Sequence, residues 1–392
     1  MNVSSRLLGA WLGVAGLATV GGIARADDDV SWPTTTRSPV ATRPETLTDS
    51  ETELVASCGR GDDRLVSVAR AVVDRKLKGL PHLDVDGLSP IQRELGEPHV
   101  WPRVWMVSGR ALEQETAKKK LDEWKGSFRV QGVRRCGVAS ATAKDGTRHV
   151  AAVAVDALAD LAPLPVRGRT GEWLTLDAHL LVPATGAHVV VMGPSGAPYT
   201  VPTSFEKGRV RARFVLDRPG RFTVQVLAHV VSGPRPVLEA NTFADVEPES
   251  ETNVAAPGED IDRGKVDAAG HLLRMVNEVR TREGLAPLER DRRLDVVAAR
   301  HASKMKARRE VGHDVGDGDP MRRLDAAGLS AKLAGENVAH ASNVALAHRA
   351  LYASPSHRTN LLKKSFDGAG IAVLEDADGS VWVTEMFAQD LE

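Results

Sequence analysis

The spacing of apolar residues changes twice along the chain, and these changes restrict the folds that it can adopt. Residues 54–155 begin with apolar side chains at helical spacing and end in strand-like runs around an Asp-Gly pair, which is typical of a β-hairpin. Residues 164–243 contain only short strand-like runs, separated by turns rich in Pro and Gly. Residues 264–392 return to helical spacing and finish in a second strand-like pair. The pattern predicts an α+β protein in which a central β-sandwich separates two α+β domains.

Two polar segments mark the edges of these domains. Residues 27–52 are rich in Thr, Ser, Pro and Asp, and residues 245–262 are strongly acidic with two prolines. Segments with so few apolar side chains bury too little surface to offset the entropy lost on ordering, so we expect a disordered linker at 27–52 and an acidic linker at 245–262. The domains should therefore occupy residues 53–160, 164–244 and 263–392.

The first 26 residues have the pattern of a secretory signal peptide. Arg6 precedes an uncharged stretch over residues 7–23, and Ala24-Arg25-Ala26 offers small residues at the cleavage site. The alternative is an uncleaved membrane anchor, but the stretch is rich in Gly and Ala and shorter than the roughly 20 apolar residues of a spanning helix. We expect cleavage after Ala26 and a secreted or periplasmic protein with no transmembrane segment.

Charge and cysteine content limit the partners and the chemistry. The formal net charge is −1, so the chain has no broad basic face and we expect no nucleic-acid partner. Its two cysteines, Cys58 and Cys136, lie in a chain that is expected to be exported, where a disulfide between them is favoured. The alternative is a pair of buried free thiols.

The chain also contains an internal repeat. Shifting the sequence by 233 residues aligns 137–154 with 370–387 without a gap, with identical residues at two Gly, one Ala, one Asp and one Val position. Each copy is centred on an Asp-Gly turn. Two unrelated hairpins would explain this, but helical patterns precede both copies in a similar order, which favours a duplicated domain.

The last third of the chain carries six phrases in order: RMVNEVRTREGLAPLERDRRLDVVAARHASKM, GHDV, AGENVA, SPSHRTNLL, GAGIAV and VWVTEMF. Together they resemble the CAP superfamily, the SCP-like proteins that include cysteine-rich secretory proteins, antigen 5 and plant pathogenesis-related proteins, and within it the bacterial branch. The resemblance implies an α-β-α sandwich with a shallow cleft that holds His and Glu side chains and, in some members, a divalent cation. Together with the repeat, it implies that residues 53–160 are a degenerate CAP-like domain.

Four positions carry over from the family to a ligand-binding site in this sequence. They are His313 in GHDV, Glu336 in AGEN, His357 in SPSHR and Glu385 in VTEMF, where many relatives have Gln. Two imidazoles with two carboxylates suit a divalent cation such as zinc, which accepts nitrogen and oxygen ligands, so His313 and His357 are also the predicted metal ligands. His301 lies on the apolar face of its helix and is interpreted as a core histidine.

The resemblance leads to one favoured function and two alternatives. The favoured function is binding of a small, lipidic or cell-envelope ligand in the His/Glu cleft. The first alternative is a metal-dependent or Glu/His-assisted hydrolase of peptide or peptidoglycan, because a His beside a carboxylate can serve in acid–base chemistry. The second is an adhesion or scaffold protein in which the cleft is incidental. No residue is assigned a catalytic role.

Overall fold

The computed structural model describes residues 32–38, 47–80, 85–231, 233–250 and 254–392. These residues form helices and several sheets, which confirms the predicted α+β class. The predicted signal peptide, residues 1–26, lies outside the described residues. Among the helices that the structure describes, none has both the length and the apolar character needed to cross a membrane.

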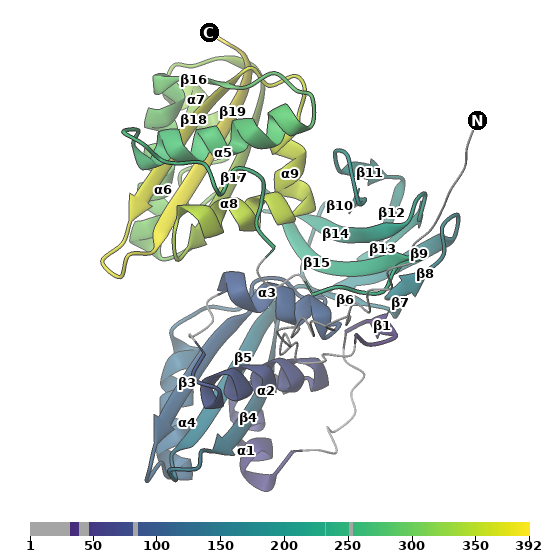
Figure 1. Ribbon diagram of the computed structural model, residues 1–392, viewed down its shortest axis with the longest axis vertical. Helices are drawn as coiled ribbons and strands as arrows, with labels where there is room; N and C mark the ends of the chain where they lie inside the picture. The colour runs from purple at the N-terminus through teal and green to yellow at the C-terminus, as the bar shows by residue number, and fades with distance from the viewer. Residues whose placement is uncertain (1–31, 39–46, 81–84, 232, 251–253) are drawn as a thin grey trace, which may run out of the picture. The chain divides into compact units, whose positions relative to one another are not determined.

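The C-terminal domain is built in three layers, with helices on both faces of a four-stranded sheet (Figure 1). One apolar cluster joins three helices to one face of the sheet, and a second joins two helices to the other face. The sheet contains, in spatial order, β16 (Glu289–Arg290), β18 (Gly368–Glu375), β19 (Val381–Leu391) and β17 (Ala331–Ala341). The first face carries α5 (Ala268–Arg282), α8 (Val344–Ala353) and α9 (Pro355–Leu361), and the second carries α6 (Arg292–Arg308) and α7 (Pro320–Ala326).

The helix boundaries in this domain follow from capping side chains. Asp267, Asp291, Asp319 and Asn343 each accept a backbone hydrogen bond at the first turn of α5, α6, α7 and α8, respectively. Helix α8 lies within residues 264–392, where the sequence returns to helical spacing. The next helix, α9, begins at Pro355, a residue that suits the first helical position, and the Ser354 side chain makes no capping hydrogen bond.

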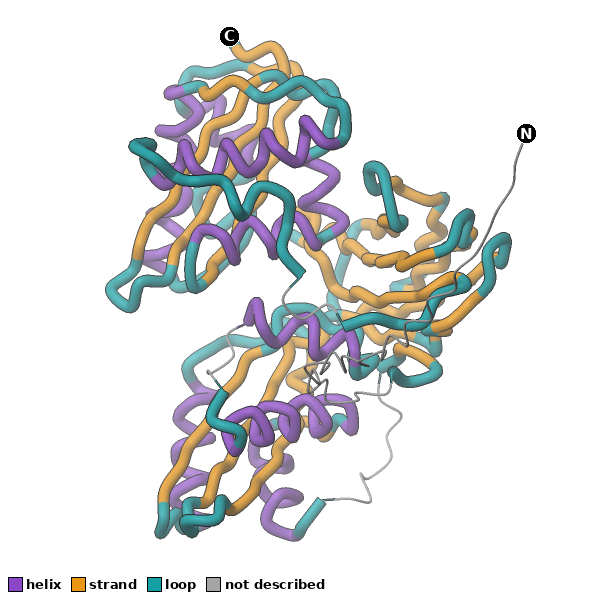
Figure 2. Tube along the Cα trace, viewed as in Figure 1, coloured by secondary structure: helices purple, strands orange, loops and turns teal. Residues whose placement is uncertain are grey.

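The N-terminal domain has the same three layers, and Figure 2 shows helices on both sides of its strands. Its sheet contains β2 (Arg60–Gly61), β4 (Val133–Thr142), β5 (Arg148–Ala157) and β3 (Arg103–Gly109). Helices α2 (Asp63–Leu77) and α3 (Val85–Glu94) share an apolar cluster with one face, and α1 (Asp49–Cys58) and α4 (Gln114–Gly126) share a cluster with the other.

The two sheets also agree in strand direction and register, which favours a duplicated domain over two unrelated hairpins. In each, a short parallel strand, a central hairpin and an antiparallel edge strand follow in the same order. A Cβ atom on Gly137 would lie 2.0 Å from the backbone carbon of Leu65, and one on Gly370 would lie 2.2 Å from that of Leu294. Both glycines therefore allow a helix to approach the sheet at the same point.

The central domain is a β-sandwich, as predicted, with one apolar cluster between its two sheets. It begins at β6 (Ala159–Leu161), slightly before the predicted boundary at residue 164. The first sheet contains β11 (Tyr199–Val201), β10 (Gly186–Met192), β14 (Gly220–Val230), β15 (Gly233–Ala244) and β8 (Arg167–Gly168). The second contains β12 (Thr203–Glu206), β13 (Arg209–Val215), β9 (Trp173–Leu180) and β6 (Ala159–Leu161).

The predicted disordered linker at 27–52 is wrong at its C-terminal end. Thr48 and Glu51 form a capping box, in which the Thr48 backbone N–H donates to Glu51 at 2.9 Å, so α1 begins inside the linker. Glu51 is buried and also accepts a hydrogen bond of 2.8 Å from the Ser140 backbone N–H. Earlier in the segment, β1 (Thr35–Thr36) pairs with β7 (Leu164–Pro165).

The predicted acidic linker at 245–262 is likewise ordered in its second half. The carbonyl of Pro257 lies 2.9 Å from His348 Nε2, and Glu259 forms an ion pair with Arg349 of α8. Acidic composition suggested a solvated segment, but these contacts with α8 hold the backbone against the C-terminal domain.

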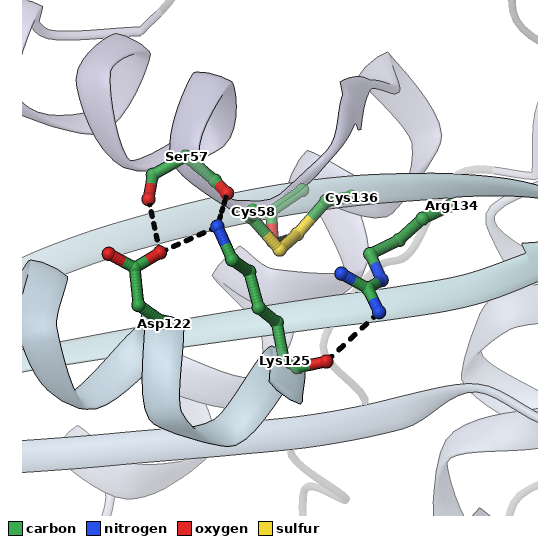
Figure 3. The surroundings of a disulfide bond; sticks show 7 residues. Ser57, Cys58, Asp122, Lys125, Arg134 and Cys136 are labelled. Carbon is green, nitrogen blue, oxygen red and sulfur yellow. Dashed lines mark hydrogen bonds and ion pairs between the residues drawn. A yellow bond between two sulfur atoms is a disulfide. The ribbon is translucent and has the colours of Figure 1, made fainter. Parts of the chain in front are cut away.

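The disulfide between Cys58 and Cys136 is present, as predicted (Figure 3). It joins the end of α1 to β4. The two Cα atoms lie 6.0 Å apart, within the usual range of roughly 4.4–6.8 Å for a disulfide. Beside it, Lys125 of α4 contacts both Asp122 and the backbone carbonyl of Ser57. The bridge and these contacts hold α1 and α4 against the same face of the sheet.

Candidate functional site

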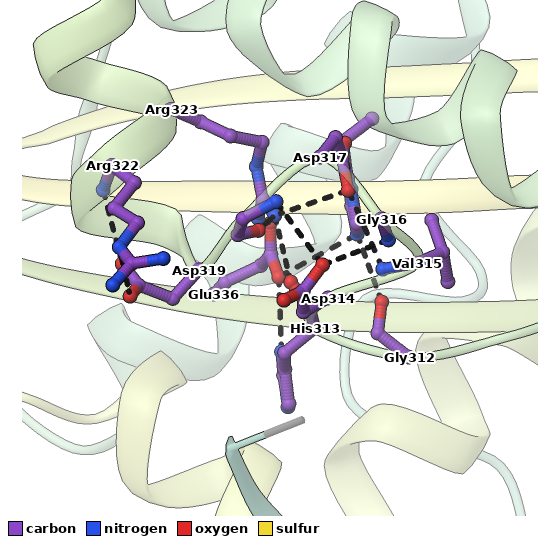
Figure 4. Close-up of polar contacts among 12 residues, drawn as sticks. Gly312, His313, Asp314, Val315, Gly316, Asp317, Asp319, Arg322, Arg323 and Glu336 are labelled. Atoms are coloured by element: carbon purple, nitrogen blue, oxygen red, sulfur yellow. Dashed lines mark hydrogen bonds and ion pairs between the residues drawn. The ribbon is translucent and has the colours of Figure 1, made fainter. Parts of the chain in front are cut away.

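Glu336 is the centre of the polar cluster in the C-terminal domain. It lies on the edge strand β17, and its side chain is fully buried on the face covered by α6 and α7. Its Oε1 atom lies 2.9 Å from Nδ1 of His313, which comes from the loop after α6 (Figure 4). The His313 side chain is 24% exposed, so the pair joins a buried carboxylate to an imidazole that reaches solvent.

Arg323 holds the other oxygen of Glu336. Its guanidinium forms a buried ion pair with Oε2 and also donates to the backbone carbonyl of His313 at 2.7 Å. Arg323 thus fixes both members of the His313–Glu336 pair. Sequence reasoning missed Arg323. The signal that could have found it is the Asp319-Pro320 pair, which begins a short helix just ahead of it.

His301 lies under this cluster and is fully buried. Its Nδ1 lies 2.8 Å from Asp317, and its Nε2 lies 2.9 Å from the carbonyl of Gly312. Both nitrogens therefore have partners, which agrees with a core histidine. Its Nε2 is also 3.7 Å from Oε1 of Glu336, so His301 packs directly behind the carboxylate.

The loop that carries His313 is shaped by its own carboxylates. Asp314 accepts backbone hydrogen bonds from Gly316 at 2.8 Å and Gly318 at 3.1 Å, and these bonds lower the pKa of its carboxyl. Both glycines have positive φ, at 88° and 84°, a conformation that favours glycine. The loop geometry therefore places the His313 backbone within reach of Arg323.

His357 approaches the cluster from the other helical layer. It lies on α9 and is partly exposed. Burial, and then the neighbouring His313, lower the pKa of the His357 imidazole to about 3. The influence of His313 shows that the two imidazoles lie near each other. Because β17 is the edge strand, the loop after α6 and helix α9 can approach each other across that edge.

Glu385 is a predicted site residue that the structure does not bring together with Glu336. It pairs across the sheet with Asn337, the neighbour of Glu336 on β17, and successive side chains of a strand face opposite sides. The Asn337 amide donates to Glu385 at 3.0 Å and to the backbone carbonyl of His357 at 3.2 Å. Burial raises the pKa of the Glu385 carboxyl to about 7. Glu385 therefore lies behind α9, on the opposite face of the sheet from Glu336.

The sequence of this domain matches a known family. Residues 273–387 match the cysteine-rich secretory protein family, CAP. The C-terminal domain is a CAP domain. A curated relative is the uncharacterized protein YkwD of Bacillus subtilis, 28% identical over 120 residues, which are 30% of this chain and 46% of that protein. The match thus spans less than half of the relative's length.

Two solved structures are also similar to this chain. An outer surface protein of Borrelia burgdorferi is 25% identical, with 33% of this chain and 96% of that chain covered and a TM-score of 0.30. An extracellular protein of Bacillus anthracis that contains an SCP domain is 18% identical, with 60% of this chain and 86% of that chain covered and a TM-score of 0.29.

The N-terminal domain lacks the polar positions of the CAP domain. Its β3–β5 register places Val104 where Glu336 lies and Ala152 where Glu385 lies, both as apolar parts of its clusters. At the sequence offset of His357, Trp124 packs on Trp105 with ring centroids 6.3 Å apart. The repeated frame therefore carries the His/Glu cluster only in its second copy, within the part of the chain that the structure describes.

Proposed function

We propose that this protein is exported and that its CAP domain binds a divalent cation through His313 and His357, with zinc as the first candidate. Through that cation and the surrounding cleft it would hold a small, lipidic or cell-envelope ligand. The observation that carries the proposal is the hydrogen bond of 2.9 Å between Nδ1 of His313 and the buried carboxylate of Glu336. Metal-binding histidines commonly use one ring nitrogen for such a carboxylate, which orients the other nitrogen.

The residues present suit the ion. Nδ1 of His313 is hydrogen-bonded to Glu336, so the other ring nitrogen, Nε2, is the one that could bind a metal. The His313 side chain is partly exposed. With a pKa of about 3, His357 is neutral near pH 7, so its lone pair is available to a metal. A bound zinc ion would supply a Lewis-acidic position for an oxygen of the ligand.

The same geometry favours binding over Glu336-assisted hydrolysis. A general base needs hydrogen-bond reach to a water or substrate. Glu336 is fully buried, and its two oxygens are already held by His313 and Arg323. It is therefore placed to position His313 rather than to accept a proton from a reacting group.

Export is supported by two features of the chain. The N-terminal segment has the pattern of a signal peptide, and disulfides such as Cys58–Cys136 persist mainly in oxidising compartments outside the cytoplasm.

Zinc titration of the full mature chain tests the proposal, with the number of bound ions measured by competition with a chromophoric chelator. Wild type should bind one more equivalent than His313→Ala/His357→Ala. Glu336→Gln should weaken that equivalent by about 10–100-fold, as for other residues that orient a ligand. His179→Ala, which removes an exposed imidazole in the β-sandwich, should bind as wild type does. Equal stoichiometry for wild type and the double variant would refute the metal site.

The ligand is tested next by native mass spectrometry with muropeptides and phospholipids as probes. Adducts should form with zinc-loaded wild type and not with His313→Ala/His357→Ala. Adducts of equal abundance on both chains would place binding elsewhere. Muropeptide cleavage by zinc-saturated wild type that is abolished in zinc-saturated Glu336→Gln would overturn the assignment of Glu336 as a positioning residue.

A further inference from the structure

Three buried polar side chains gather at the start of α2 in the N-terminal domain, far along the chain from the CAP site. They are Asp62, Glu97 and His99, with exposures of 1%, 0% and 3%. One ligand atom from each lies within 4.8 Å of the others. Among the residues that the structure describes, these three form the one group of His, Cys, Asp or Glu side chains whose ligand atoms all lie that close together.

Two oxygens of this group are buried without a hydrogen-bond partner among the described residues. Asp62 uses Oδ1 to cap α2, accepting from the backbone of Arg64 at 2.9 Å and Leu65 at 3.3 Å, and its Oδ2 has no partner. Glu97 uses Oε1 to accept from the backbone of His99 at 3.1 Å, and its Oε2 has no partner. Burying an unpartnered carboxylate oxygen is costly, so we expect a bound cation or a proton at each of these two atoms.

The orientation of His99 fits a metal ligand. Its Nε2 lies 3.0 Å from the carbonyl of Ala159 and can only donate to it, which leaves Nδ1 facing Oε1 of Glu97. A backbone carbonyl that accepts from the distal nitrogen is a common support for a metal-binding imidazole. The His99 carbonyl in turn accepts from the buried Gln92 amide at 2.8 Å, which holds the ring's backbone in place.

The neighbouring cation does not satisfy the two oxygens. Arg135 of β4 is fully buried and close enough to influence Asp62, but it forms its ion pair with Asp160. Its remaining guanidinium nitrogens make no hydrogen bond with a described residue, so neither Asp62 Oδ2 nor Glu97 Oε2 is reached. The pocket thus holds two carboxylates and an imidazole that converge. His99 Nδ1 contacts Oε1 of Glu97, while one oxygen of each carboxylate has no partner among the described residues.

The equivalent corner of the CAP domain is different, although the fold is the same. Asp291 caps α6 as Asp62 caps α2, and the backbone N–H of each donates to the matching strand. Asp291 is partly exposed and forms an ion pair with Arg293 at 2.8 Å. The buried trio is therefore not required by the repeated frame.

We propose that Asp62, Glu97 and His99 form a second, buried site for a divalent transition-metal ion, with zinc as the first candidate. One imidazole nitrogen and two carboxylate oxygens are ligands that zinc accepts. The ion would pin the segment 97–99 to the first turn of α2 and so stabilise the N-terminal domain. The site is independent of the proposed CAP site.

The test uses the mature full-length chain carrying His313→Ala/His357→Ala, so that the CAP site cannot contribute. Because the trio is buried, the chain is unfolded in guanidinium with chelator, its disulfide kept intact, and refolded with zinc, with manganese or with chelator. After desalting, metal content is measured by plasma mass spectrometry. We expect about one zinc ion per chain after refolding with zinc, and a higher thermal midpoint than after refolding with chelator.

The matched variants are Asp62→Asn and Asp291→Asn in the same background. Asn caps a helix about as well as Asp, so both variants keep their caps. Asp62→Asn should bind zinc at least about tenfold more weakly, as should Glu97→Gln, whereas Asp291→Asn should leave binding unchanged.

Three results would overturn the proposal. The first is that the folded parent chain, which carries His313→Ala/His357→Ala, retains neither zinc nor manganese. Asp62, Glu97 and His99 would then share protons instead of a metal ion. The second is equal metal content in Asp62→Asn, Glu97→Gln and their parent. The third is a cobalt spectrum, which needs no variant at the trio and so remains decisive if those variants fail to fold. Cobalt added to the parent chain during refolding should give the visible absorption of an ordered site with nitrogen and oxygen ligands. A spectrum of aqueous cobalt would refute the site.

Discussion

Glu385→Gln should stabilise the CAP domain at alkaline pH and have little effect at acidic pH. Glu385 is fully buried, with one oxygen bonded to Asn337 and the other without a hydrogen-bond partner among the described residues. Burial raises the pKa of its carboxyl from 4.5 to about 7. A glutamine of the same shape keeps a carbonyl oxygen for Asn337 and carries no charge to bury.

The sign follows from the proton balance. Below pH 4.5 the carboxyl is protonated in both the folded and the unfolded chain, so it contributes no pH dependence. Between pH 4.5 and 7 the unfolded chain releases the proton and the folded chain keeps it, so the free energy of unfolding falls as the pH rises. Above pH 7 the loss is complete. At roughly 1.4 kcal/mol per pKa unit, the loss is about 3 kcal/mol.

The measurement is urea unfolding of wild type and Glu385→Gln at pH 4, 6 and 8. Hydrogen exchange in peptides from β17 and β19 identifies the transition that belongs to the CAP domain, since the chain has more than one domain. The difference in the free energy of unfolding between the two chains should grow with pH and level off above pH 7. A difference that stays constant from pH 4 to 8 would refute the reasoning.

Three further changes have defined outcomes. His357→Gln should reduce the loss of stability on acidification. The pKa of His357 in the folded chain lies below its ordinary value of 6.5, so the unfolded chain takes up this proton first as the pH falls, which favours unfolding. Identical urea midpoints for wild type and His357→Gln from pH 7 to 4 would contradict this. Arg323→Met should lower the free energy of unfolding by about 3–5 kcal/mol, because it leaves Glu336 buried without its cation. Adding Glu336→Gln should restore part of that loss, and a double variant no more stable than the single one would count against the ion pair. Cys58→Ala/Cys136→Ala should lose about 4 kcal/mol in urea unfolding through the entropy of the unfolded chain, and an unchanged midpoint would show that the bridge is not stabilising.

The sequence predicts the elements of the fold well where the pattern is local. The two hairpins centred on Asp-Gly turns both appear where the strand-like runs and turn residues place them. The capping box at Thr48 and Glu51 was equally local, but it lies in a segment whose composition suggested disorder. Composition describes the average of a segment, whereas one cap can begin a helix.

The site could be predicted only in part, because it depends on strand register. His313, Glu336 and His357 come from three phrases of the family, and the structure places His313 beside Glu336 and near His357. The position of Glu385 depends on its pairing with Asn337, and a shift of one residue would move its side chain to the other face. Arg323 carries no family phrase, and only the fold shows that it reaches Glu336.

The two α-β-α domains show which residues of the repeat serve the frame and which serve the chemistry. Gly137 and Gly370 allow a helix to approach the hairpin at the same point, and Asp62 and Asp291 cap that helix in both copies. These positions shape the backbone in both copies. The polar side chains do not coincide: one copy gathers them at its edge strand β17, and the other gathers them at the start of α2. Burying a carboxylate without a partner is costly. Two different buried clusters on one frame are therefore best explained by two separate cation sites rather than by the remnant of a single site. Metal content measured separately for each cluster therefore decides whether the first copy has only lost a site or has also gained one.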